Sequence, residues 1–310
     1  MLTFFLASSP IFAVVAIGFA AARLGWLAPA GIAAFAAFAF DVALPALVTS
    51  LLARQPLSSI FDARFFAALL GAGALVFAAT AALTALARPG LRVVGAHAQA
   101  ATTGNLGFLG VPLLLALLGE KATGPLAMAI LAEVGLLMPL GIVLMSLGRE
   151  RGGESRHVLR DVARATLGNP IVLGVCAGLA VGISGSRLPV PVDRFLSFVG
   201  ASAGPTALFA LGGSLAARRI GPHWGAVAGI AAAKLVVYPA VAWVLLRSTG
   251  LPASWVAAGV LIAALPTAAN VFVFAQRYDA VPERVSAEIL LSTVAGAATF
   301  PIVAWLVLPG

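Results

Sequence analysis

The stretch GNLGFLGVP places an amide side chain among residues that interrupt helices, within an apolar part of the sequence. Asn105 lies between Gly104 and Gly107, and Pro112 closes the stretch. Proline removes a backbone donor and clashes with the preceding turn, and glycine weakens a helix. Backbone groups freed in this way are costly in lipid unless protein or a water-filled cavity covers them. The stretch therefore predicts a broken membrane helix whose backbone and amide line a binding site.

A second stretch, LPTAANVFVFAQRY, combines the same ingredients in Pro266 and Asn270. Two broken helices at matching places would meet near the middle of the bilayer. Their half-helix N-termini would offer free N–H groups and positive dipole ends, which suit an anion. The alternative is that both are packing kinks, because glycine and proline are common in membrane helices.

Three ionisable side chains, Asp41, Glu133 and Lys234, fall well inside apolar runs. Charge inside a membrane is costly and indicates a functional site with a partner group. Asp41 can form an ion pair with Lys234, or Lys234 can attract an anionic substrate. A buried carboxyl group can also hold a proton, and Asp41 is the preferred titrating group, with Glu133 as the other candidate. The alternative is that some of these side chains lie nearer an interface and extend into water.

The two halves of the sequence are related. Shifts of 160 or 165 residues superpose Gly18 on Gly178, Pro45 on Pro205, Thr102 on Thr267 and Asn105 on Asn270. Pro45 and Pro205 are candidate hinges, with simple kinks as the alternative. A repeat with an odd number of helices inserts upside down the second time, which is typical of many secondary transporters.

The composition restricts the class of protein. The chain has 310 residues, of which 61% are hydrophobic and 10% charged, and its mean hydropathy is +1.07. Soluble domains are about a quarter charged, so we expect a polytopic membrane protein in a lipid bilayer. The net charge of +8 is spread between apolar runs, which argues against a nucleic-acid partner. P-loop, G-x-S-x-G and H-E-x-x-H motifs are absent from the sequence, so we expect no enzyme activity, cofactor or metal.

Ten apolar runs are long enough to span a membrane, for which about 20 residues are needed. They cover about 4–23, 30–53, 64–87, 95–118, 123–148, 167–184, 193–217, 224–247, 253–276 and 285–308. A polar loop at 149–166 separates a first five-helix repeat, 1–148, from a second, 167–310. With both termini outside, twelve basic residues fall inside and six outside. The positive-inside rule then places the loop in the cytoplasm. We expect the protein in the inner (plasma) membrane.

The motifs NLGFLGVPLL, FVFAQRYDAVPE, LGNPIVLGVCAGL and DVALPALV together resemble the auxin efflux carrier family. The resemblance covers essentially the whole chain. It implies an all-α fold of two inverted five-helix repeats with discontinuous crossing helices 4 and 9, similar to bile-acid and sodium–proton transporters. It also implies scaffold and transport domains, and small carboxylates as substrates. The chain departs from plant members in its short central loop and in Gln276, where many of them have lysine.

Three functions follow as hypotheses. The first is a secondary carrier that exports small organic anions by alternating access, driven by the membrane potential or a proton. The second is sodium- or proton-coupled uptake on the same fold, with oxygen ligands for sodium from Thr102, Thr103, Asn105 and Thr267. The third is a membrane scaffold or receptor without transport, which predicts straight helices. The sequence leaves open whether the chain forms a homodimer.

Overall fold

The computed structural model describes residues 2–55, 60–148, 155–218 and 223–308. Within these ranges every regular element is a helix. Gly104 and Thr267 form an isolated antiparallel β-bridge. Six helices in the described ranges are long and apolar enough to cross a membrane: Pro29–Ala53, Ala63–Leu86, Leu106–Leu147, Val190–Leu215, Trp224–Arg247 and Pro282–Val307. The expectation of an all-helical polytopic membrane protein is therefore confirmed.

The chain divides into two compact units, each built from both halves of the sequence. Unit 1 comprises Met1–Ala63, Leu106–Ile130 and Asn169–Arg218. Unit 2 comprises Arg64–Asn105, Leu131–Gly168 and Arg219–Gly310. Compact packing therefore does not follow the division at 149–166.

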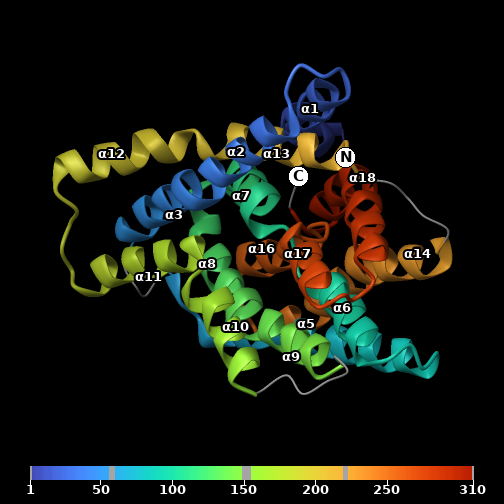
Figure 1. The fold of residues 1–310 in the computed structure, drawn as a ribbon. Helices are drawn as coiled ribbons and strands as arrows, with labels where there is room; N and C mark the ends of the chain where they lie inside the picture. Colours follow the sequence, from blue (N-terminus) through green and yellow to red (C-terminus); the bar gives the residue numbers. More distant parts are fainter. Residues whose placement is uncertain (1, 56–59, 149–154, 219–222, 309–310) are drawn as a thin grey trace. The chain divides into compact units, whose positions relative to one another are not determined.

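Unit 1 contains the helices expected first, second, sixth and seventh along the chain. Its elements are α1 (Leu2–Arg23), α2 (Pro29–Phe38), η1 (Ala39–Ala43), α3 (Leu44–Ala53), η2 (Leu106–Gly110), α7 (Val111–Leu118), η3 (Gly119–Ala122), most of α8 (Thr123–Ala132), α11 (Pro170–Ile183), α12 (Val190–Ala201) and α13 (Ala203–Leu215). α1 packs along α13, and α3 lies between α11 and α12 (Figure 1).

Glycines allow these helices of unit 1 to approach closely. A Cβ atom on Gly18 of α1 would collide with the carbonyl oxygen of Phe209 in α13, and one on Gly212 would collide with that of Val15. In the other helix pair, a Cβ atom on Gly178 of α11 would lie 3.0 Å from the carbonyl oxygen of Thr49 in α3. Within lipid the hydrophobic effect does not drive helices together, and the close approach that small residues allow lets van der Waals packing stabilise the pair.

Unit 2 contains the remaining helices. Its elements are α5 (Ala63–Leu86), α6 (Leu91–Thr102), η4 (Glu133–Leu137), α9 (Met138–Leu147), α10 (Ser155–Leu167), α14 (Trp224–Ala232), η5 (Ala233–Val237), α15 (Tyr238–Arg247), α16 (Ala253–Ala263), α17 (Asn270–Arg277) and α18 (Pro282–Val307). α6 packs against α9, α15 packs against α16, and α18 packs against both α14 and α16.

Helix α10 forms where the sequence predicted only a loop at 149–166. Residues 149–154 of that range lie outside the described residues. α10 packs against α9, and the Thr166 hydroxyl donates to the carbonyl oxygen of Val134 at 3.2 Å. The apolar residues of the sequence SRHVLRDVARATL recur at helical spacing, which is the pattern of an amphipathic helix. The helices predicted from the sequence rested on long apolar runs, and this segment was not recognised because it contains many charged residues.

Each π-helical segment in the described ranges is followed closely by a proline. The segments η1, η2, η4 and η5 precede Pro45, Pro112, Pro139 and Pro239, each of which is the second residue of the next α-helix. A proline ring clashes with the carbonyl group four residues earlier. A wider turn relieves that clash, and such π-bulges occur frequently at functional sites.

Candidate functional site

The first interruption in unit 2 follows α6. The helix ends at Thr102, and Thr103 adopts an extended conformation with φ −83° and ψ 110°. Gly104 and Asn105 continue as extended chain before helical structure resumes at Leu106. Asn105 is only 3% exposed, so its backbone depends on partners from within the protein.

The second interruption, between α16 and α17, supplies those partners. The Asn105 N–H donates to the carbonyl oxygen of Pro266 at 2.8 Å, and the Ala268 N–H donates to that of Thr103 at 3.1 Å. Gly104 and Thr267 are thereby paired as an antiparallel bridge. Pro266 favours this extended chain because a residue before proline avoids the helical conformation. The two broken segments thus meet inside unit 2, and we call their meeting point the crossing.

Pro112 and Gly107 lie beyond the first interruption. Gly107 belongs to η2 and Pro112 to the first turn of α7, and helical structure is continuous through both. A missing N–H costs little in the first turn of a helix, so the interruption occurs before Pro112 and not at it. Pro45 likewise lies in the first turn of α3, and Pro205 lies near the start of α13. Their role as hinges stays a prediction.

Glu133 reaches the crossing from η4. Its side chain is 1% exposed, and Oε2 accepts a 2.8 Å hydrogen bond from the Gly104 N–H. The other oxygen, Oε1, has no hydrogen-bond partner among the described residues. Glu133 therefore holds a backbone donor that the end of α6 would otherwise leave unsatisfied.

Lys234 reaches the same region from η5. Its side chain is fully buried, and Nζ donates a 2.6 Å hydrogen bond to the carbonyl oxygen of Ala263, the last residue of α16. Nζ also lies 4.7 Å from the centre of the Tyr238 ring. The carboxyl groups of Glu133 and Glu288 both interact electrostatically with this ammonium group. A single cation thus serves two carboxyl groups and the end of a helix.

Glu288 of α18 is a member of the site that sequence reasoning missed. It is fully buried, and its Oε1 lies 2.7 Å from the Thr267 hydroxyl oxygen. The same hydroxyl lies 2.7 Å from the carbonyl oxygen of Ala100, and the Thr267 N–H donates to Ser292 Oγ at 3.2 Å. The available signal was the position of Glu288 within the apolar C-terminal run.

Several other buried polar atoms of unit 2 have no hydrogen-bond partner in the described ranges. They are both amide atoms of Gln99, the hydroxyl groups of Thr103 and Tyr238, Nε2 of His97 and Oδ1 of Asn270. Gln99 is fully buried against Gly141 of α9. Unsatisfied buried polar groups are rare in folded proteins and call for an explanation. Unit 2 therefore contains buried donors and acceptors of the kind that a small polar ligand would need.

The remaining predicted residues lie elsewhere. Asn270 is the half-buried first residue of α17, just beyond the second interruption. Asp41 belongs to η1 in unit 1, and its side chain is exposed. The described contacts of Lys234 are to residues of unit 2. Asp41, Glu133 and Lys234 share one local feature, since each lies in a π-helical segment.

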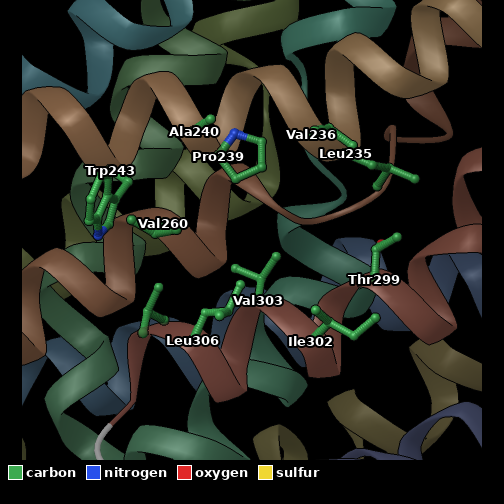
Figure 2. Close-up of a pocket in the computed structure, with 11 residues that line it drawn as sticks. Leu235, Val236, Pro239, Ala240, Trp243, Val260, Thr299, Ile302, Val303 and Leu306 are labelled. Carbon is green, nitrogen blue, oxygen red and sulfur yellow. The ribbon is translucent and has the colours of Figure 1, made fainter.

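A separate groove of about 500 Å³ runs between α15 and α18. Figure 2 shows Pro239 and Trp243 on one side and Val303 and Leu306 on the other. Thr299 is the polar residue in an otherwise apolar lining. This lining offers no charge to a carboxylate, so the crossing is the better candidate for an anion site.

Comparison with known proteins identifies the family of the chain. A family model described as "Membrane transport protein" matches residues 3–305. The chain is 32% identical to a protein of Rhizobium meliloti (strain 1021) that is named as a malonate transporter, over 97% of this chain and 95% of the relative. It is 24% identical to an uncharacterised transporter of Methanocaldococcus jannaschii, over 66% of each chain. The chain therefore belongs to the auxin efflux carrier family of membrane transport proteins, and it is a transporter and not an enzyme.

Proposed function

We propose that this transporter is a secondary carrier that moves small organic anions, with the crossing of unit 2 as the substrate site. The observation that carries the proposal is the bridge between Gly104 and Thr267, where two interrupted helices meet among buried polar groups. Interrupted helices are stable in a membrane where they line a protein cavity. The substrate carboxylate meets the side chains of Asn105 and Asn270, near the chain at Gly104 and Pro266.

Malonate is the first substrate to test. The relative named as a malonate transporter aligns with nearly the whole chain. Malonate has two carboxylates on one carbon, so it can use several hydrogen-bond donors at once. Lys234 supplies positive charge near the crossing, and the Gln99 amide supplies a donor that has no protein partner in the described ranges.

Two inverted five-helix repeats are part of the proposal. Gly18 and Gly178, which a shift of 160 residues superposes, each lie at a close helix contact of unit 1. The pairs α1–α13 and α11–α3 then correspond under the repeat. Alternating access moves the unit that carries the crossing against the other, by rocking or in an elevator-like motion. Both termini lie outside and 149–166 lies in the cytoplasm, in the inner membrane.

Export driven by the membrane potential is the leading direction, because the potential favours outward movement of anions. Coupled uptake with a proton or sodium is the alternative. Sodium needs several oxygen ligands, and the hydroxyl oxygen atoms of Thr102 and Thr267 keep their lone pairs because each hydroxyl donates its proton to a backbone carbonyl. A scaffold or receptor without transport predicts straight helices, and the two interruptions count against it.

The test is malonate flux in proteoliposomes under an imposed membrane potential. We expect Asn105→Ala and Asn270→Ala each to reduce flux, and the double variant to abolish it. Loss of one charge-assisted hydrogen bond costs about 1.5–3 kcal/mol, or roughly ten- to a hundredfold in affinity. Wild-type flux in the double variant would remove the substrate site from the crossing.

Asn169→Ala is the matched control. The Asn169 side chain caps α11 by accepting from the N–H groups of Ile171 and Val172. Its loss should lower stability by about 1 kcal/mol and leave malonate affinity unchanged. Equal losses of affinity in all three variants would point to general destabilisation and contradict the proposed site.

A further inference from the structure

Two carboxyl groups and one amino group are buried together at the crossing. Among the described residues, the carboxyl and amino side chains classed as buried are Glu133, Glu288 and Lys234. An unpaired ion in such a place costs several kcal/mol and is normally neutralised. Two carboxyl groups that face one ammonium group favour a proton on one of the two, and the hydrogen bonds of Thr267 indicate which one.

The hydroxyl group of Thr267 contacts two oxygen atoms but has one proton to give. It lies 2.7 Å from the carbonyl oxygen of Ala100 and 2.7 Å from Oε1 of Glu288. In an uninterrupted helix the Ala100 carbonyl would accept from the Gly104 N–H, which here donates to Glu133. The end of α6 thus leaves that carbonyl to be satisfied from outside the helix, and Thr267 does so. A carbonyl oxygen can only accept, so the proton in the second contact comes from the Glu288 carboxyl.

We propose that Glu288 holds a proton at the crossing and exchanges it during the transport cycle, so that one proton is bound together with the organic anion. This inference rests on the proposed function for its transport step. Glu133 and Lys234 then form an ion pair, and the protonated Glu288 donates to Thr267. All three side chains are neutralised within the cluster.

A proton fits this position better than a metal ion. The Lys234 ammonium group interacts with both carboxyl groups and would repel a second cation. One oxygen of each carboxyl is already hydrogen-bonded, to Gly104 or to Thr267. A proton on Glu288 requires no cage of ligands, whereas sodium would need several oxygen atoms.

The other ionisable groups on α18 and on the elements packed against it can be located. Lys234 of η5, Arg92 and His97 of α6, and Arg277 of α17 lie on elements that pack against α18, and α14 and α16 carry no ionisable group. Lys234 interacts electrostatically with Glu288. Arg277 is exposed, and Arg92 is paired with Asp279 at 3.4 Å. On α18 itself, Glu283 is exposed and Arg284 lies 3.3 Å from His223 Nε2.

The sign of the coupling follows from electrostatics. A substrate carboxylate near the crossing repels an ionised Glu288 and so favours its protonated form. By linkage, the proton strengthens anion binding by the same factor. If Glu288 loses its proton, its carboxylate competes with the Ala100 carbonyl for the one proton of Thr267, and the crossing loosens. A dianion with one proton still carries a net negative charge, so the membrane potential still favours export.

The first experiment needs no substrate and compares infrared spectra of the purified wild type and Glu288→Gln. Glutamine is neutral and keeps a donor for Thr267, so the variant should fold. We expect the carbonyl stretching band of a protonated carboxylic acid in the wild type and its loss in Glu288→Gln. Glu283→Gln, an exposed residue of the same helix, should keep the band. Identical wild-type and Glu288→Gln spectra in this region would overturn the assignment of the proton.

The second experiment measures malonate binding by calorimetry in buffers of different ionisation enthalpy. At a pH above the range in which the substrate-free protein keeps the proton of Glu288, the wild type should take up about one proton per malonate more than Glu288→Gln. The variant shows only the contribution of malonate itself. Across the pH range in which Glu288 titrates, wild-type affinity should increase up to about tenfold more per unit fall in pH than that of the variant. Equal proton uptake in the two proteins would overturn the coupling. If neither protein binds malonate, the proposed substrate fails, while the infrared spectra still decide the state of Glu288.

Discussion

The amide nitrogen of Asn105 and the carbonyl oxygen of Pro266 are 2.8 Å apart and join the two interrupted segments of unit 2. This hydrogen bond belongs to the main chain. Replacing the Asn105 side chain therefore removes an amide from the crossing while the bridge between the segments remains. For this reason Asn105→Ala tests binding more directly than a change at Pro266 would.

Thr267→Val removes the hydroxyl group that links Ala100 to Glu288. Both partners are buried, and an unsatisfied buried polar group costs about 1–3 kcal/mol. We expect a lower melting temperature in detergent, measured by intrinsic fluorescence. Thr293→Val is the matched control, because Thr293 is also buried and its hydroxyl donates to the Ile289 carbonyl of its own helix. Similar losses in the two variants would mean that the link across the crossing adds no stability.

Gly18→Ala and Gly212→Ala should both destabilise unit 1. The added methyl group meets the carbonyl oxygen of Phe209 or Val15 on the facing helix, and backbone cannot move aside as a side chain can. Overpacking of this kind costs about 1–3 kcal/mol. Gly229→Ala, where no heavy atom lies within 4 Å of the new methyl group, should be neutral or slightly stabilising. Thermal unfolding would decide, and neutral results at Gly18 and Gly212 would contradict the α1–α13 packing.

Pro239→Ala should change the position of Lys234. Without the proline ring, η5 can revert to regular α-helix. A π-helical turn holds one residue more than an α-helical turn, so this change would rotate the residues before it by about 100°. Lys234 would then lose its hydrogen bond to Ala263, and we expect malonate flux to fall. Pro301→Ala is the control, since Pro301 lies inside α18 without a preceding π-helical segment. Unchanged flux in Pro239→Ala would show that the wide turn does not position Lys234.

Arg54→Ala should have little effect in spite of good geometry. Arg54 forms a bidentate ion pair with Asp193, with a shortest distance of 2.9 Å, but the two side chains are 45% and 33% exposed. Exposed ion pairs contribute about 0–1 kcal/mol and are screened by salt. We expect a small decrease in melting temperature at low salt and none at high salt. A large decrease at high salt would contradict this interpretation.

The positions of the helices were largely predictable, since apolar runs of the right length occur wherever the chain must cross lipid. Both interruptions were also predictable, because Gly104 and Pro266 disfavour helix at those positions. The sequence pattern placed the first interruption too close to Pro112. This proline begins a helix instead of ending one. Proline has opposite effects in the first turn and in the interior of a helix, and sequence alone did not show which applied.

Glu288 was missed because the predicted span began at 285, which placed this residue near the membrane surface. α18 begins at Pro282 and buries Glu288 completely. The π-helical segments were missed for a different reason. Periodicity assigns a helix but not the width of its turns, and only the following proline gives a local clue. The partners of Lys234 come from distant parts of the sequence, and tertiary packing alone brings them together.

Two of the hydrogen bonds that join the interrupted segments, from Asn105 to Pro266 and from Ala268 to Thr103, connect peptide groups, which has a consequence for the diversification of such carriers. A side chain such as that of Asn105 can be exchanged while these main-chain hydrogen bonds remain. New substrate preferences can therefore arise through single replacements, while the main-chain contact between the two segments and the fold stay the same.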